Sequence, residues 1–485
     1  MIDRTLVSSL NAQQRYIPPS PRLSGYAKLD VVWVPALLVI HALLGVFISD
    51  SPLLATAHAG LVMLAGLWWA LSSASLERVA CLAAYATGAE TLWRMTRAEI
   101  PWEFSKYAIT GILILGLLRA GRLQAPAPSL LYFMLLLPSV ILPMANVNGT
   151  ELRNELSFNL SGPLALAVSA WFFSHVKLAP AQLSRVFLSA ICPITATGAI
   201  ALYKIVTAKE IVFTHGSNPA LSGGFGPAQV SAALGLGALM SFLWAMDKTV
   251  SRQMRLILLA LTLYLLGQSA LTFSRGGLYM ACGGALLASF FLVKDRKTRM
   301  RLFIIAILLG AAVNFIALPR LDEFTGGKLT RRIQDTGLTG RDSIAAGDLR
   351  VFADHPLFGV GPGQTGYFRD QYGNYSRAHA HSEFSRLLAE HGVFGMAAIL
   401  ILFALSIQHF LRARSPQGRA LIVSMIAWSF LFMLSLAMRL AAPSFVFGMT
   451  AATVLQGDGQ ENGQRNGQEN GQRNGQEHTN ARPTI

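Results

Sequence analysis

The sequence predicts an all-α, polytopic membrane protein with about 12 to 14 transmembrane helices and one large, partly helical periplasmic loop. Hydrophobic residues make up 53% of the 485-residue chain and charged residues only 13%, about half the charged fraction of a soluble globular protein. Apolar runs recur from Val31 almost to Leu455, and many approach the roughly 20 residues that a helix needs to cross a hydrocarbon core. Such spans must be helical, because lipid offers no partner for backbone polar groups.

The candidate spans lie at residues 31–48, 53–71, 79–93, 108–118, 129–144, 163–173, 186–205, 228–246, 256–272, 278–293, 302–318, 393–410, 420–436 and 441–455. The runs at 79–93 and 108–118 are short enough to be half-spans or partly buried helices. The spans divide the chain into a cytoplasmic N-terminal segment (1–30), transmembrane helices (31–318), a large periplasmic loop (319–391), C-terminal transmembrane helices (392–455) and a disordered low-complexity tail (456–485).

Both ends of the chain are polar. The stretch before Val31 lacks the apolar core and small-residue cleavage site of a signal peptide, so we expect the first span to direct membrane insertion. The tail repeats Gly-Gln-Glu-Asn and Gly-Gln-Arg-Asn between residues 457 and 478. Because these repeats offer no apolar residue to bury, they predict a disordered appendage without a catalytic role.

Basic residues predict the orientation of the chain. The net charge of +15 would suit a nucleic-acid partner, but Lys and Arg form short clusters between apolar runs rather than one basic face, so we expect none. Such clusters remain on the cytoplasmic side of a membrane. They recur in alternate loops, at residues 4–28, 119–122, 177–185, 248–255, 294–301 and 412–419. This alternation places the loop at 319–391 in the periplasm of a bacterial inner membrane.

The three cysteines, Cys81, Cys192 and Cys282, fall inside or at the edge of apolar runs, with no CxxC and no histidine at ligand spacing. Neither a disulfide framework nor a zinc site is expected from this pattern. The sequence likewise indicates no cofactor.

Several predicted outward-facing segments are richer in polar and glycine residues than a simple connection requires: 151–163, 213–229, 272–277 and the long loop. In TFSRGG (272–277), Arg275 is expected at the outer end of a helix. An arginine there can simply extend to lipid head groups. Its small neighbours also leave space for the guanidinium to hold diphosphate oxygens through its planar set of donors.

The long loop exceeds ordinary loop lengths several-fold, which favours a folded functional element. It contains TGR with Arg341, a segment at 342–352 that is compatible with a helix, and the motif HPLFGVGPG at 355–363. Pro356 and Pro362 restrict the chain and end that helix, while the glycines between them permit close backbone approach. The motif follows no predicted strand, so it is weak evidence for phosphate binding.

The end of the loop carries His379, His381 and Glu383. An amphipathic helix is predicted to begin near His381, with Phe384 and Leu387 on its apolar side. An imidazole there can accept a proton from a hydroxyl near neutral pH, as a general base does. The alternatives are a metal site, for which no third firm ligand is evident, and a purely structural pair.

Taken in order, these motifs resemble the O-antigen ligase and polymerase superfamily, membrane glycosyltransferases that move glycan from a polyprenyl diphosphate to an acceptor. The similarity covers roughly residues 151–419. It rests on SFNLSGPLAL (157–166), SGGFGPAQVS (222–231), TFSRGG, TGR, HPLFGVGPGQ (355–364) and HAHSEFSRLLAEHGVFG (379–395).

The resemblance implies that Arg275 and Arg341 hold the diphosphate of the lipid donor and that His381 is the base for the acceptor hydroxyl. Family members usually have Asn directly after that histidine, whereas Ser382 and Glu383 follow it here. The choice of base among His379, His381 and Glu383 therefore stays open. Two guanidinium groups would stabilise the charge on the departing diphosphate without a metal, and single displacement predicts inversion at the sugar carbon.

The implied partners are an undecaprenyl-diphosphate-linked glycan donor, a glycan or lipid A core acceptor, and membrane lipids. The motifs do not separate O-antigen ligation from polymerisation of O-antigen or exopolysaccharide, or from transfer to protein. A polysaccharide-precursor transporter or flippase is the alternative from another class, since it would also have many spans and interior arginines. No inverted repeat is visible to support it.

Overall fold

The computed structural model describes residues 26–72, 75–144, 148–208, 218–293, 300, 340–372 and 379–455. Its elements, in chain order, are α2 (Tyr26–Ile48), α3 (Pro52–Ser72), α4 (Leu76–Met95), α5 (Phe104–Arg119), α6 (Ala127–Met134), η2 (Pro138–Val140), α7 (Ile141–Met144), α8 (Gly149–Ser174), β1 (Lys177–Leu178), α9 (Pro180–Thr207), η3 (Ala220–Ser222), α10 (Pro227–Ala245), α11 (Arg252–Leu271), α12 (Gly276–Leu292), α16 (Arg341–Asp354), α17 (Thr365–Arg369), η5 (Asp370–Tyr372), α18 (Glu383–Arg412), α19 (Pro416–Leu436), α20 (Ala442–Met449) and β2 (Thr453–Val454).

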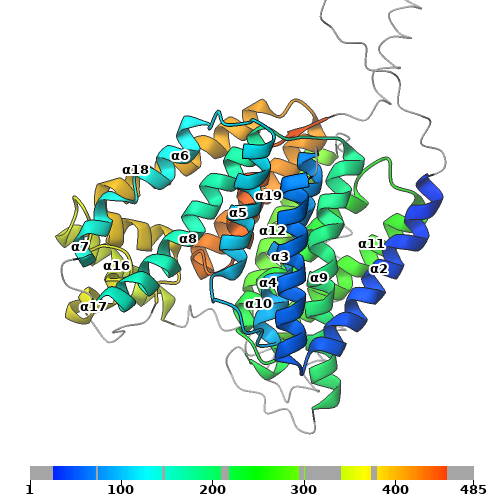
Figure 1. The fold of residues 1–485 in the computed structure, drawn as a ribbon, viewed down its shortest axis with the longest axis horizontal. Helices are drawn as coiled ribbons and strands as arrows, with labels where there is room; N and C mark the ends of the chain where they lie inside the picture. The colour runs from blue at the N-terminus through cyan, green and yellow to red at the C-terminus, as the bar shows by residue number, and fades with distance from the viewer. Residues whose placement is uncertain are drawn as a thin grey trace, which may run out of the picture.

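The helices form one bundle, with α16 and α17 gathered at one side of it (Figure 1). Within the described ranges, nine segments are long and apolar enough to cross a membrane, and α12 is a shorter apolar helix. The protein is thus an all-α polytopic membrane protein, as the sequence predicts. The larger number of spans remains a prediction, in part because the candidate at 302–318 lies outside the described residues.

Some boundaries differ from those predicted. The segment 151–163, expected as an outward-facing loop, is helical, because α8 begins at Gly149 with Asn148 as its N-cap and continues past Pro163. The expected span at 441–455 is wrong: α20 has eight residues, and β2 follows it. The run at 129–144 is divided into α6, η2 and α7 by the turn that ends α6 and by Pro138.

Among the described residues, the basic segment at 177–185 follows the end of α8, whereas the His379–Glu383 segment lies nearer the start of α8. At one end, Arg185 Nε is 2.5 Å from Glu77 Oε1, and β1 pairs in parallel with β2. At the other end, the Ala437 amide donates to the carbonyl of His381 at 2.8 Å. This separation agrees with the alternation of positive loops along the sequence.

Two glycine-bearing motifs meet where α10 crosses α12. A side chain at Gly277 would place its Cβ 1.9 Å from the Ser231 carbonyl, so only glycine allows this approach. The Ser231 hydroxyl donates to the Ser274 carbonyl at 2.8 Å and accepts from the Gly277 amide at 3.2 Å. The SGGFGPAQVS and TFSRGG motifs therefore hold each other, and together they place Arg275 at the start of α12.

Candidate active site

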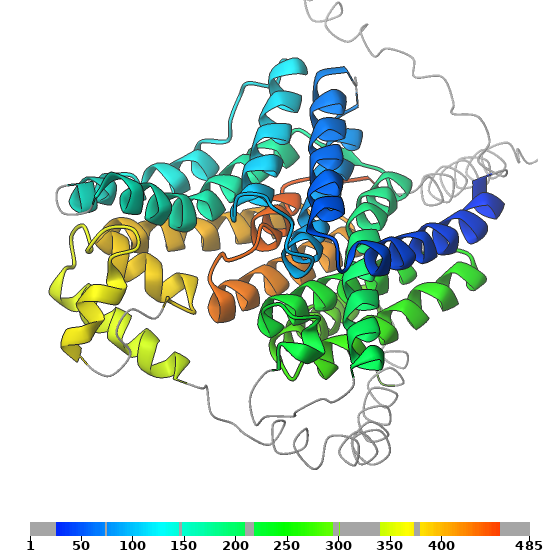
Figure 2. The same cartoon turned by 60° about the horizontal axis from the view of Figure 1, so that its bottom comes forward.

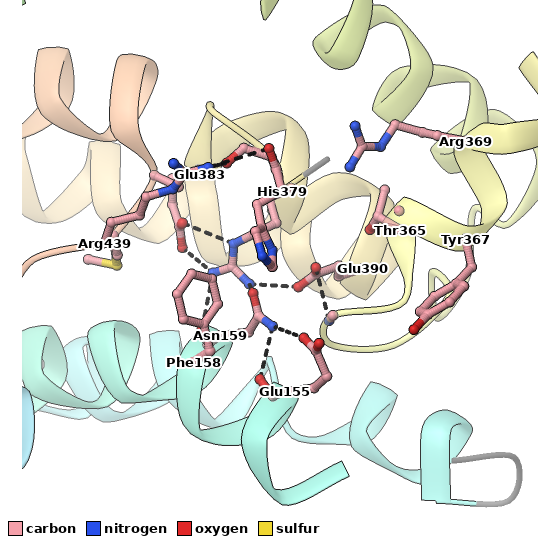
Figure 3. A pocket seen from close by; sticks show the side chains of 16 residues that line it. Glu155, Phe158, Asn159, Thr365, Tyr367, Arg369, His379, Glu383, Glu390 and Arg439 are labelled. Carbon is pink, nitrogen blue, oxygen red and sulfur yellow. Dashed lines mark hydrogen bonds and ion pairs between the residues drawn. The ribbon is translucent and has the colours of Figure 1, made fainter. Parts of the chain in front are cut away.

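A cavity opens where the loop residues meet α8, α18 and the α19–α20 turn (Figure 3). It contains about 690 Å³ of space free of protein atoms, part of it open solvent. Its lining residues are Glu155, Phe158, Asn159, Gly363, Thr365, Gly366, Tyr367, Arg369, His379, Ala380, Glu383, Arg386, Glu390, Ala437, Met438 and Arg439. Figure 2 shows α16 and α17 beside α18 and α8 at this side of the molecule.

The HPLFGVGPG motif binds the loop to α18 through the backbone. Gly392 interrupts α18 with φ 60° and ψ −136°, which leaves backbone groups there open to other partners. The Val360 amide donates to the Ala389 carbonyl at 3.0 Å, and the Val393 amide donates to the Pro356 carbonyl at 2.8 Å. A Cβ at Gly359, where φ is +68°, would lie 2.4 Å from the backbone of Glu390. The glycines thus serve helix contact rather than phosphate binding.

The turn between α19 and α20 holds the His379–His381 segment from the other side. Arg439 Nη2 donates to the carbonyls of Ala380 at 3.0 Å and His379 at 3.4 Å. The Ala437 amide donates to the carbonyl of His381 at 2.8 Å. The His379 ring packs against Phe158, with the ring centroids 5.1 Å apart. Hydrogen bonds to three successive carbonyls orient both imidazoles before any ligand arrives.

Positive charge collects around these histidines. Burial, together with repulsion from Arg439, Arg341 and Arg369, lowers the pKa of His381 to about 4. Burial also lowers the pKa of His379, with Arg439 and Arg369 adding to the effect. Burial and Arg341 bring the pKa of Arg439 to about 10. Both imidazoles are therefore neutral at pH 7, so each can accept a proton.

We call these three arginines, Arg341, Arg369 and Arg439, the cationic cluster. Arg341 begins α16, after Gly340 in a left-handed conformation. Arg369 ends α17 and is 4% exposed, with its Nε 3.0 Å from Asp348 Oδ1. Asp348 also accepts from the Ser385 hydroxyl at 2.7 Å. All three guanidinium groups lie close enough to His381 to lower its pKa, so positive charge gathers there, an arrangement that favours an anionic ligand.

A second group of charges, one arginine held between two glutamates, lies in the cavity lining. Arg386 Nη2 is 2.5 Å from Glu383 Oε1, Arg386 Nε donates to Glu383 Oε2 at 3.0 Å, and Arg386 Nη1 donates to Glu390 Oε2 at 2.6 Å. Its Nη1 and Nη2 also donate to the Asn159 side-chain and backbone oxygens. All three charged side chains are at most 4% exposed. We call Arg386, Glu383 and Glu390 the compensated triad.

The structure brings together most of the sequence-predicted site residues. His379 and Glu383 line the cavity, His381 follows in the same segment, and Arg341 repels it. Arg275 is not among the lining residues, so its role remains a prediction. Over the described part of the chain, no group of three or more His, Cys, Asp or Glu side chains is arranged as metal ligands. The helix predicted at 342–352 is confirmed as α16, and the one predicted near His381 as α18, with Ser382 as its N-cap.

Other site residues were missed at the sequence level. Arg369 and Arg439 lie outside the motifs that were singled out, and Glu155 was noted only as part of a polar segment. The polar side of an amphipathic helix ordinarily faces water. In α18 this side is buried, and Arg386 pairs there with both Glu383 and Glu390. The Glu383–Arg386–Glu390 spacing was the available signal, since i, i+3 and i+4 side chains meet on one face of a helix.

A larger groove adjoins the cavity along α8. It contains about 1920 Å³ of space free of protein atoms, including open solvent, and shares Glu155, Phe158 and His379 with the cavity. Its other lining residues are Pro101, Trp102, Glu103, Tyr107, Phe133, Gly149, Leu152, Arg153, Asn154, Leu156, Ser157, Leu160, Ser161 and Leu164. Apolar side chains predominate in its exposed lining, so it suits a hydrocarbon chain.

The bundle and the cavity define a multi-pass membrane protein with an anion-attracting site at one end of its helices. Residues 257–400 match the O-antigen ligase family (Wzy_C). The chain therefore carries an O-antigen ligase domain, the domain of a family of membrane enzymes. The matched residues include Arg275, Arg341 and the His379–Glu383 segment, whereas Glu155 and Arg439 lie outside them. A comparison with curated proteins finds no match.

Proposed function

We propose that the protein transfers glycan from an undecaprenyl-diphosphate-linked donor to a hydroxyl of a glycan or lipid A core acceptor. The reaction takes place at the periplasmic face of a bacterial inner membrane. The observation that carries the proposal is the cationic cluster beside two neutral imidazoles. Transfer leaves a diphosphate whose charge grows as the sugar bond breaks, and guanidinium groups directed at that charge stabilise the transition state.

His381 is the base in this proposal. Its Nδ1 is buried and has no hydrogen-bond partner among the described residues, and its low pKa keeps the ring neutral. Both carboxylate oxygens of Glu383 already bind Arg386, which supports a structural role for Glu383. His379 forms the cavity wall against Phe158. The hydroxyl deprotonated by His381 attacks the anomeric carbon directly, so the new linkage has inverted configuration.

The adjoining groove gives the donor a place for its lipid. A polyprenyl chain lying among the leucines of α8 would put its diphosphate where the groove meets the cavity, since both share Phe158 and His379. The hydrophobic effect then contributes to binding without affecting the chemistry. The proposal needs no metal ion, because the guanidinium groups supply the positive charge. Transfer by the purified protein should persist in EDTA.

Activity of histidine variants in cells tests the proposal. A strain lacking the gene is complemented with wild type, His381→Ala or His379→Ala, and its lipopolysaccharide and secreted polysaccharide are compared on gels. Loss of a general base lowers the rate about 10² to 10⁴-fold, so His381→Ala should lose nearly all product while inserting normally. His379→Ala should retain more activity. Normal product from His381→Ala would remove His381 from the mechanism.

Topology provides an independent test. Cysteine substitutions at exposed loop positions such as Asp342 and Ser343 should react with a membrane-impermeant reagent added from the periplasmic side. A cysteine in place of Arg122, which lies in a predicted cytoplasmic loop, is the control and should not react with this reagent. A cytoplasmic location for α16 would contradict the proposal, because the glycan would then be assembled on the wrong side of the membrane.

A further inference from the structure

The wall of the cavity that faces Arg439 differs from the cationic cluster in its chemistry. Beside Arg369 of the cationic cluster, this wall carries Glu155 from α8 together with Thr365 and Tyr367 from α17. Figure 3 shows Thr365 and Tyr367 on the side opposite Arg439, with Glu155 below them. A carboxylate, a hydroxyl and an aromatic ring are poor partners for a phosphate but suit a sugar, which offers hydroxyl donors and an apolar ring face.

Glu155 is held in position by a chain of contacts that begins at the compensated triad. Arg386 Nη1 donates to Asn159 Oδ1 at 3.2 Å, which fixes the orientation of that amide. Asn159 Nδ2 therefore points at Glu155 and donates to its Oε2 at 3.1 Å. Gly363 makes room for the carboxylate, because a Cβ there would lie 2.1 Å from Glu155 Oε2. Such fixed acceptors bind a ligand with little loss of side-chain entropy.

Thr365 carries the second observation. Its side chain is 2% exposed, and its Oγ1 is buried with no hydrogen-bond partner among the residues that the structure describes. A buried hydroxyl without a partner is costly, and this one belongs to the cavity lining. A ligand hydroxyl would satisfy it. Tyr367 lies in the same lining and is 44% exposed as a residue, and an aromatic ring suits the apolar face of a sugar.

We infer that Glu155, Thr365 and Tyr367 form the subsite for the sugar that is bonded directly to the donor diphosphate. The inference rests on the proposed function, because the cationic cluster must hold that diphosphate in the same cavity. The Glu155 carboxylate accepts hydrogen bonds from ring hydroxyls, Thr365 bonds another hydroxyl, and Tyr367 covers one face of the ring. Glu155 lies outside the matched family region, whereas Thr365 and Tyr367 lie within it.

Binding of short lipid diphosphates to the purified full-length protein tests the inference. The probes are farnesyl diphosphate and farnesyl diphosphate bearing N-acetylglucosamine or galactose. Wild type should bind at least one sugar-bearing probe more tightly than farnesyl diphosphate. Glu155→Gln should weaken binding of that probe about tenfold or more, the loss expected for one charged hydrogen bond, and leave farnesyl diphosphate binding unchanged. Glu99→Gln, at an exposed position outside the lining of both the cavity and the groove, is the matched control.

Thr365 provides a second pair of variants in case Glu155→Gln does not fold. Thr365→Val keeps the shape and removes the hydroxyl, so it should weaken only the sugar-bearing probe, and Thr365→Ser should restore binding. Equal affinity of wild type for all probes, or equal weakening of all probes in the variants, would overturn the sugar subsite alone. Failure of wild type to bind any of the probes would instead overturn the proposed function together with the inference.

Discussion

The compensated triad and the cationic cluster contain the same kind of side chain in neighbouring positions, yet their surroundings differ. Arg386 has two carboxylates and an amide oxygen as partners and is almost fully buried. The cluster instead surrounds His381, whose pKa is lowered to about 4 by burial and by repulsion from these arginines. A buried arginine held between two carboxylates contributes to structure, whereas several guanidinium groups gathered around one histidine favour an anionic ligand. Burial alone therefore does not identify a functional arginine.

The largest effect on stability is expected from breaking the compensated triad. Arg386→Ala would leave Glu383 and Glu390 as buried, unpaired charges, which should lower the free energy of unfolding by about 3–5 kcal/mol. Denaturant titration of the purified protein in detergent measures this free energy of unfolding. Arg350→Ala, at an exposed position of α16, is the control and should change stability little. An Arg386→Ala protein as stable as wild type would mean that the triad is not structurally important.

Removing one guanidinium from the cationic cluster should instead affect ligand binding. Arg341→Ala is expected to weaken farnesyl diphosphate binding by about 10- to 100-fold, the range for one charge-assisted hydrogen bond. Its unfolding should stay close to that of wild type. Calorimetry with Arg350→Ala as the control checks both points. Unchanged affinity with reduced stability would reverse the roles assigned to the two groups of arginines.

The acid limb of the pH–rate profile tests the coupling between the cluster and the base. Protonated His381 cannot accept a proton, so kcat/KM should fall as the pH drops toward its pKa of about 4. Arg439→Gln removes a neighbouring positive charge, which should raise the pKa of His381 toward its ordinary value and move the fall in kcat/KM to higher pH. Arg439→Lys keeps the charge and should keep the acid limb in place. Identical limbs for wild type and Arg439→Gln would exclude this coupling.

The smallest effect on stability is expected from a surface hydrogen bond between α17 and α8. The Tyr367 hydroxyl donates to Glu151 Oε1 at 2.9 Å near the cavity rim. Tyr367→Phe removes this bond but keeps the ring, so stability should change by about 0.5 kcal/mol or less. Affinity for a sugar-bearing probe should be retained in Tyr367→Phe and reduced in Tyr367→Ala. A loss in Tyr367→Phe as large as that in Tyr367→Ala would assign the effect to the hydroxyl instead of the ring.

Much of the architecture was readable from the sequence because membrane insertion depends on local properties. Hydropathy predicted the helices now seen as α2, α3, α9, α10, α11 and α19 within a few residues. The errors arose where a polar segment continues a helix, as in α8, or where an apolar run stops early, as after α20. In both places packing decided: the Ser444 hydroxyl donates to the Gly162 carbonyl at 2.8 Å, which joins α20 to α8.

By itself the sequence determined the class of protein, its family resemblance and the loop segment that carries the histidines, since composition and short motifs express these directly. Only the tertiary structure decided which arginines are matched by carboxylates and which surround His381. It also decided that Glu155 and Arg439, far apart along the chain, line one cavity. The physical reason is that charge compensation depends on distances of a few ångströms between side chains, and such distances are set by how helices pack rather than by residue order.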